Sequence, residues 1–220
     1  MGGLLVQVAI YGLAAAFAAP IAVVVTALIL GKSERPVVSG WTFVAGAAFL
    51  DVVFAVVILA ADLFEEGGDA GAIVDVGLGV LFVAMGLLAV FQAESPEKDA
   101  ARRAQADKIA VAKLSTLFAA GLAVQVINFD AIAVFGGALK DIGEANITTG
   151  QEVLATLFGL AIMLCVYYAP VVIYMIDRKR AMPLLARMTE WIMANSRRLE
   201  IVVGLGFGAY FLAKGLAVLL

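Results

Sequence analysis

Two acidic residues lie within long apolar runs, far from either end of the run. Asp51 is close to the centre of the run 37–61, and Asp130 lies a little past the centre of the run 112–139. An acidic residue at mid-bilayer costs about 2.5–3.5 kcal/mol on insertion scales, so it generally faces a cavity or a partner. Both residues therefore predict a proton or cation site. A structural hydrogen bond between helices is the alternative for each.

Polar and helix-breaking residues accompany these carboxylates. Pro20 interrupts the run 4–30, and Asn128-Phe129-Asp130 are expected to interrupt the run 112–139 at the corresponding place, with Gln125 one turn earlier. A proline removes a backbone donor and frees a carbonyl in a membrane helix. We therefore predict a substrate or ion site built from Asp51, Asn128, Asp130, Pro20 and Gln125, with Asp51 and Asp130 as ligands if a metal binds. A kink needed only for packing is the alternative for the proline.

Several other chemistries are excluded by composition. The chain has no histidine and one cysteine, Cys165. This excludes zinc sites built on His or Cys, haem ligation by His, and nucleophile pairs that need His. A bound cation would need oxygen ligands. We expect no enzymatic activity and no cofactor beyond a proton or an oxygen-liganded cation.

The elements that position these residues are membrane helices. Of the 220 residues, 64% are hydrophobic and 15% charged, whereas soluble domains average about 45–50% apolar and about 25% charged. A membrane span needs about 20 mostly apolar residues. The sequence predicts an all-α integral membrane protein with six transmembrane helices, at residues 4–30, 37–61, 70–92, 112–139, 152–176 and 201–220.

The connections between these runs alternate in charge. Twelve Lys or Arg residues fall in the connections 31–36, 93–111 and 177–200, and one, Lys140, falls in the connections 62–69 and 140–151. Basic connections face the cytoplasm. We expect a multi-pass plasma-membrane protein with both termini outside the cytoplasm.

The last basic connection also has a helical pattern. Met182, Leu185, Met188 and Trp191 recur at helical spacing among basic residues. This predicts an amphipathic interfacial helix at about residues 180–197, before the last span. A cytosolic helix packed on the bundle is the alternative.

Two segments of the chain resemble each other. Residues 21–28 and 132–139 agree at five of eight positions, each in the first span of its half. Three spans per half reverse the orientation of the second half, which predicts a 3+3 inverted repeat with a site near the midplane. The repeats would be residues 1–92 and 112–220, joined by a cytoplasmic linker at 93–111.

A proline, two charged residues and the glycines of the apolar runs indicate structural features. A further interruption is expected at Pro170 in the fifth run. Asp75 and Lys214 lie within about two turns of the ends of their runs, and we expect both to extend toward the head groups. The abundant glycines, Gly46 and Gly204 among them, indicate close packing of helices.

Short motifs at both ends carry a family resemblance. Residues 182–192 (MPLLARMTEWI), followed by 195–198 (NSRR) and a final span with Lys214-Gly215-Leu216, resemble the closing region of the GAP family. That family includes the mycobacterial sulfolipid-addressing and glycopeptidolipid-addressing proteins. Residues 18–21 (AAPI) resemble its small-x-Pro-Ile motif, and the resemblance implies that Pro20 lines the central interruption.

The resemblance also implies a branch of the LysE exporter superfamily, whose members export amino acids, metal ions or lipids. The chain departs from the family in the fourth run, where relatives commonly have Asn-Pro and this chain has Asn128-Phe129-Asp130. Residues 130–134 (DAIAV) are instead similar to segments of manganese exporters.

Two functions follow from the sequence. The first is a secondary exporter of a small solute or ion, coupled to protons or cations through Asp51 and Asp130. The second is a lipid-addressing membrane protein that assists export of cell-envelope lipids or glycolipids. The expected partners are membrane lipids and the exported substrate, with no nucleic acid. The sequence is compatible with a homodimer. One cysteine leaves no intramolecular dithiol for an electron carrier.

Overall fold

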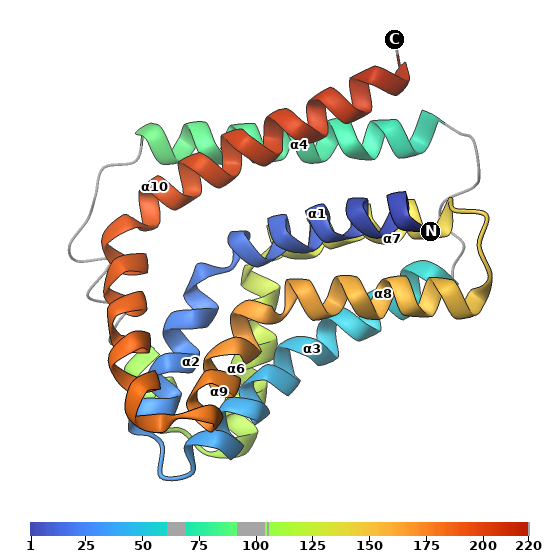
Figure 1. Cartoon of the computed structure of the whole chain (residues 1–220). Coiled ribbons are helices and arrows are strands. Elements are labelled where there is room, and N and C mark those ends of the chain that lie inside the picture. Colours follow the sequence, from blue (N-terminus) through green and yellow to red (C-terminus); the bar gives the residue numbers. More distant parts are fainter. Residues whose placement is uncertain (61–68, 92–103, 105, 220) are drawn as a thin grey trace.

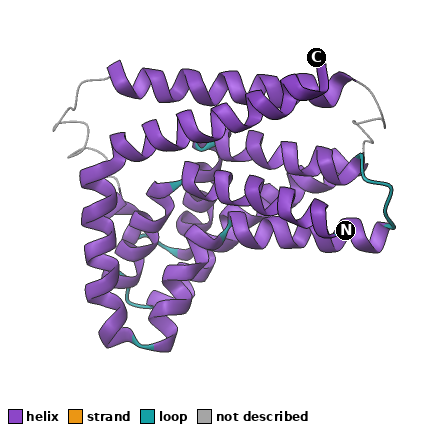
Figure 2. Cartoon of the chain, turned by 45° about the horizontal axis from the view of Figure 1, so that its top comes forward, coloured by secondary structure: helices purple, strands orange, loops and turns teal. Residues whose placement is uncertain are grey.

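The computed structural model describes residues 1–60, 69–91, 104 and 106–219. In that part of the chain every regular element is a helix and no strand occurs (Figure 2), which confirms the all-α prediction. Most of the acidic connection 62–69 and of the basic linker 93–111 lies outside the described residues.

Three single helices and three bent helix pairs are long and apolar enough to cross a membrane. The single helices are α3 (Pro36–Ala60), α4 (Asp69–Phe91) and α10 (Arg178–Leu219). The bent pairs are α1 (Gly2–Ala18) with α2 (Pro20–Lys32), α6 (Leu114–Ile127) with α7 (Phe129–Gly143), and α8 (Thr149–Met163) with α9 (Cys165–Ile176). The described chain thus has three to six spans, and six if each bent pair is one span.

The helices form two groups that meet at the bends. One group is α4, the later part of α10, and α1, α7 and α8, which run beneath that pair in Figure 1. The other is α2, α6, α9 and the first part of α10, which turn away toward the opposite end of the molecule. Both termini lie at the same end in this view. Apolar side chains from both groups form buried clusters, one around Phe43 and Tyr167 and one around Tyr11 and Phe135.

The breaks in the first and fourth runs fall where the sequence predicts them. The first pair bends by 63° at Ala19, immediately before Pro20, and the second bends by 74° at Asn128. Proline is tolerated as the first residue of α2, because the N–H that it lacks would have had no partner within that helix. Both predicted interruptions are therefore present.

The break in the fifth run lies upstream of its prediction. The chain bends by 70° at Leu164, and Pro170 lies inside α9. A proline ring clashes with the carbonyl four residues earlier, here that of Val166, so it disturbs the turn that precedes it. The expected position of this interruption was wrong by about one and a half turns of helix.

The segment predicted as a separate interfacial helix is continuous with the last span. Residues 180–197 form the first part of the 42-residue helix α10. Residues 193–200 (MANSRRLE) contain no proline or glycine, so the sequence offers no signal to end the helix before the apolar run begins.

Glycines allow two helix pairs to approach closely. A Cβ on Gly46 of α3 would overlap the carbonyl of Phe118 in α6, and one on Gly121 would overlap the carbonyl of Phe43. In the other pair, a Cβ on Gly204 of α10 would lie 2.7 Å from the Cα of Gly86 in α4. The packing role expected for these glycines is confirmed.

Candidate functional site: a cavity at the helix breaks

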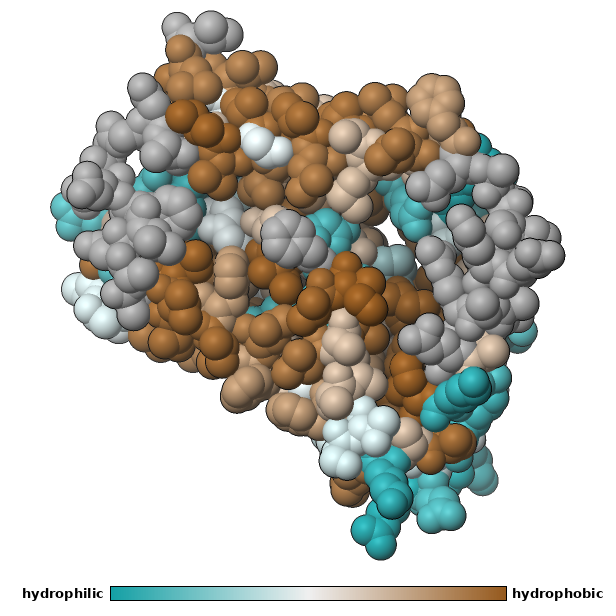
Figure 3. All heavy atoms as spheres, turned by 180° about the vertical axis from the view of Figure 1, so that it is seen from behind, coloured by the Kyte–Doolittle hydropathy of each residue, from teal (hydrophilic) through white to brown (hydrophobic). Residues whose placement is uncertain are grey.

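A cavity of about 580 Å³ lies where the two predicted helix breaks meet. Pro20 at the start of α2 and Asn128 at the start of α7 both line it. Residues of α4, α6 and α10 complete the wall, and Figure 3 shows the molecule hollowed beneath the apolar α4–α10 pair. Ligand sites in proteins typically occupy roughly 300–1,000 Å³, so this space is large enough for a small molecule or part of a lipid.

Most of the cavity wall is apolar. Alkyl and aromatic side chains line it, including Phe17, Ile21, Val24, Phe82, Met85 and Leu88. Four polar side chains interrupt this surface: Asn128, Asp130, Ser196 and Glu200. The cavity therefore combines a large apolar wall with a few polar groups, a composition suited to a ligand that has both apolar and polar parts.

The charged groups of the wall have one sign. Asp130 of α7 and Glu200 of α10 are the only charged residues lining the cavity among those the structure describes, and the two carboxylates repel each other. The nearby Arg197 donates from Nε to the carbonyl of Ala89 at 2.9 Å and from Nη2 to that of Val90 at 2.7 Å. Its guanidinium thus binds the last carbonyls of α4, where a cation is favoured.

A chain of hydrogen bonds leads from the cavity to Asp51. Asn128 donates from Nδ2 to the Tyr167 hydroxyl at 3.3 Å, and this hydroxyl donates to Oε1 of Gln125 at 2.6 Å. Gln125 then donates from Nε2 to Oδ1 of Asp51 at 2.8 Å. Asp51 is 0% exposed, and its Oδ2 has no hydrogen-bond partner within the described part of the chain.

The five residues predicted as a site fall in two adjoining places. Pro20, Asn128 and Asp130 line the cavity, whereas Asp51 and Gln125 lie behind it at the far end of the hydrogen-bonded chain. The described residues hold no group of three or more His, Cys, Asp or Glu side chains that could bind a metal. The metal role of the two carboxylates stays a prediction.

Tyr167 is the member of this arrangement that sequence reasoning missed. It is buried, and its hydroxyl links the amides of Asn128 and Gln125. A tyrosine in an apolar run has a large apolar body, so its sequence context does not distinguish a packing role from a hydrogen-bonding one. The one indication of a functional role in the sequence was the position of Tyr167 just before Pro170 in the fifth run.

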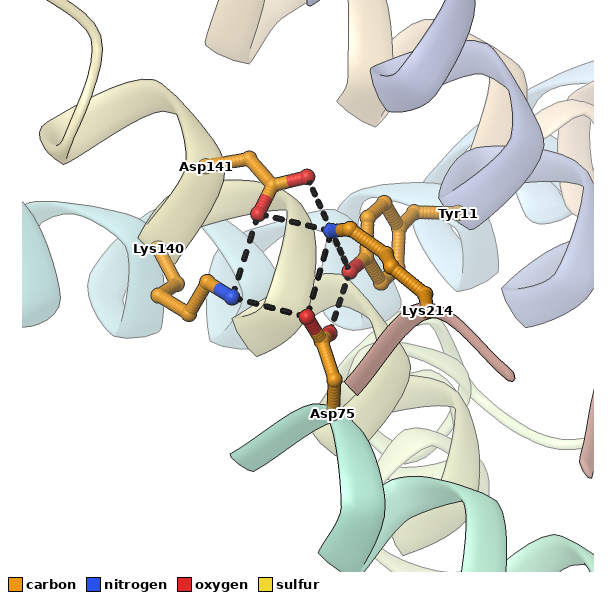
Figure 4. Close-up of polar contacts among 5 residues, drawn as sticks. All are labelled: Tyr11, Asp75, Lys140, Asp141 and Lys214. Carbon is orange, nitrogen blue, oxygen red and sulfur yellow. Dashed lines mark hydrogen bonds and ion pairs between the residues drawn. The ribbon is translucent and has the colours of Figure 1, made fainter. Parts of the chain in front are cut away.

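A second polar cluster ties four helices together, and we refer to it as the ionic network. Its members are Tyr11 of α1, Asp75 of α4, Lys140 and Asp141 of α7, and Lys214 of α10 (Figure 4). Lys140 lies 2.9 Å from Asp75, and Lys214 lies 2.7 Å from Asp141. The Tyr11 hydroxyl donates to Asp75 at 2.6 Å and accepts from Lys214 at 2.7 Å.

This cluster contradicts the expectation that Asp75 and Lys214 extend to the head groups. Asp75 is 2% exposed, and Lys214 lies 3.3 Å from it. The close packing of α4 on α10, together with Tyr11 from the middle of α1 and the end of α7, places partners beside both charges. A paired charge no longer needs to reach water, because its partner offsets much of the loss of hydration.

Comparison with known proteins identifies the family. A family model described as Sap, sulfolipid-1-addressing protein matches residues 8–217. No curated protein and no solved structure shows significant similarity to the chain. The match agrees with the GAP-family resemblance of the sequence motifs, whereas membership of the LysE superfamily stays a prediction. With nearly its whole length matched, the chain belongs to the sulfolipid-1-addressing protein family.

Proposed function

We propose that this protein is a non-enzymatic, lipid-addressing membrane protein that receives an amphiphile in the cavity at the helix breaks. The observation that carries the proposal is the composition of that cavity, with an apolar wall from α1, α2 and α4 and polar groups on α7 and α10. An acyl chain would lie against the apolar wall, and the polar end of the amphiphile would lie near Asn128 and Asp130. The family match supports this role.

We also propose that the two halves of the chain form an inverted repeat around this cavity. The bends of 63° and 74° occur in the first span of each half, and the third spans, α4 and α10, pack on each other. The break between α8 and α9 has no counterpart in the continuous α3. The charge of the connections supports a plasma-membrane location with both termini outside the cytoplasm.

Filling the cavity tests the proposed function. Ser196→Phe places a ring in the cavity, whereas Ala194→Phe makes a similar change on an exposed face of the same helix outside it. We expect deletion of the gene to lower the amount of an envelope lipid at the surface of its host. Complementation should succeed with Ala194→Phe and fail with Ser196→Phe, as measured by mass spectrometry of surface-extracted lipids. An unchanged lipid profile after deletion contradicts the proposal.

A second candidate is proton- or cation-coupled export of a small solute. The specific observation in its favour is Asp51, a buried carboxyl group with one unpaired oxygen, joined through Gln125, Tyr167 and Asn128 to the cavity. Such a group can take up or release a proton or cation when the cavity opens.

For this candidate, Asp130→Asn should reduce coupled transport to background in vesicles that contain the purified protein. The exchange is nearly isosteric, so the folded fraction by size-exclusion chromatography should match that of the parent. Glu190→Gln, which neutralises an exposed carboxylate on α10 outside the cavity wall, provides the control. Normal transport by Asp130→Asn would exclude the coupling role.

A further inference from the structure

The polar groups of the cavity are mostly hydrogen-bond acceptors. Asp130 and Glu200 contribute carboxylates, and Asn128 has its N–H₂ group directed to Tyr167. Asn128 is 8% exposed, and its amide oxygen accepts no hydrogen bond from any residue that the structure describes. The Ser196 hydroxyl donates a long hydrogen bond, 3.5 Å, to the carbonyl of Met193. A ligand that binds the two carboxylates and the Asn128 amide oxygen must therefore supply donors.

Two cations of α10, Arg197 and Lys214, bind groups outside the cavity. No Lys or Arg is among the described lining residues, and Arg197 donates to the carbonyls that end α4. Lys214 lies 14 residues beyond Glu200 on α10, which is roughly 20 Å along the helix. It binds Asp75 and Asp141 in the ionic network. An anionic ligand in the cavity would thus meet two carboxylates and no free cation in the described wall.

The start of α7 does not provide an anion site either. Helix N-termini attract anions through unpaired N–H groups and the positive end of the helix dipole. Here Asp130 lies in the first turn of α7 and supplies a carboxylate from the protein itself. An incoming sulfate or phosphate would have to compete with this carboxylate at close range.

We propose that the cavity selects an amphiphile whose polar end is rich in hydrogen-bond donors and carries no net negative charge, and that it disfavours sulfated or phosphorylated amphiphiles. A sugar or an ammonium head group has the required chemistry. The proposal rests on the lipid-binding function proposed above. The family is named for a sulfolipid, so this chain departs from that name in the polar part of its ligand.

Three amphiphiles with the same photoactivatable acyl chain and different heads provide the test: a glucosyl, a trimethylammonium and a sulfate head. Each is added to the protein in phosphatidylcholine nanodiscs, and labelled residues are mapped by mass spectrometry. Labelling of Val56 and Val57, exposed on α3, measures simple contact with the bilayer. Relative to these positions, we expect the sulfate probe to label cavity residues about tenfold less than the glucosyl and trimethylammonium probes, as a repulsion of about 1.4 kcal/mol would produce.

Neutralising the carboxylates identifies the cause of the selection. In the variant Asp130→Asn/Glu200→Gln, sulfate labelling of the cavity should rise to the level of the glucosyl probe. Glu190→Gln should leave the ratio between probes unchanged. Equal labelling by all three probes in the parent protein, or an unchanged ratio in the double variant, overturns the selection while leaving the lipid-binding function supported. Absence of cavity labelling with every probe overturns the lipid-binding function as well.

Discussion

Replacing Asp75 by asparagine is expected to lower the free energy of unfolding by about 3–5 kcal/mol. The substitution keeps the shape of the side chain but removes one of the two carboxylates in the ionic network. Lys140 and Lys214 would each lose the carboxylate oxygen of Asp75, which lies 2.9 Å and 3.3 Å from them, while Asp141 would stay beside both. Tyr11 would also lose the carboxylate to which it donates. The cost arises mainly from the loss of the Asp75 charge beside two largely buried cations.

The chain contains a convenient probe for this measurement. Cys165 is the only cysteine and is partly buried, so reaction of its thiol with a fluorogenic dye during heating reports unfolding at one position. For a chain of this size, a loss of about 4 kcal/mol corresponds to a decrease of about 10 °C in the apparent unfolding temperature.

An exposed ion pair provides the matched control. Lys32 and Asp107 lie 2.7 Å apart with both side chains close to half exposed, and such pairs contribute about 0–1 kcal/mol. Asp107→Asn should therefore change the unfolding temperature little. The double variant Asp75→Asn/Lys214→Met should recover part of the loss, because it also removes one of the cations that Asp75 pairs with. Equal, small effects of Asp75→Asn and Asp107→Asn would show that the network does not stabilise the fold.

The helix breaks were predictable because their causes are local. Pro20 and Asn128 mark the break positions within a few residues of sequence, and both lie at the cavity. At Pro20 the cause is the missing backbone N–H, which the residue type alone specifies. The fifth run shows the limit of this argument. Pro170 correctly indicates that the helix of this run is interrupted, but it does not indicate the residue at which the helix bends. Packing against neighbouring helices determines the position of the bend.

The ionic network could not be predicted in the same way. Asp75 and Lys214 lie on different runs, each near an end of its run. A charged side chain at such a position is stabilised either by reaching the head groups or by pairing with an opposite charge on another helix. The choice depends on which helices touch. Here the glycines on the α4–α10 face allow an approach close enough for pairing. Tyr11 gave no signal, since nothing in its apolar run indicates the carboxylate that it meets.

Replacing Gln125 by leucine is the second substitution with a large expected effect. Gln125 bridges Asp51 and Tyr167 through one donated and one accepted hydrogen bond. Leucine fills a similar volume but leaves Asp51 and Tyr167 without the hydrogen bonds that Gln125 makes to them. Each buried polar group left unsatisfied costs about 1–3 kcal/mol, and more if it is charged. The same thiol-reactivity measurement on Cys165 should show a clear decrease in the unfolding temperature.

Removing the partner groups as well separates hydrogen bonding from packing. When both members of a buried hydrogen bond become apolar, the net cost can be small. The triple variant Gln125→Leu/Asp51→Leu/Tyr167→Phe should therefore unfold at a higher temperature than Gln125→Leu alone, although it carries more changes. If each added substitution instead lowers the temperature further, shape complementarity around Asp51 stabilises this region, and the hydrogen-bonded chain does not. A gain in stability would mean that Asp51 is retained at a cost to the fold, as expected for a carboxyl group kept for a functional role.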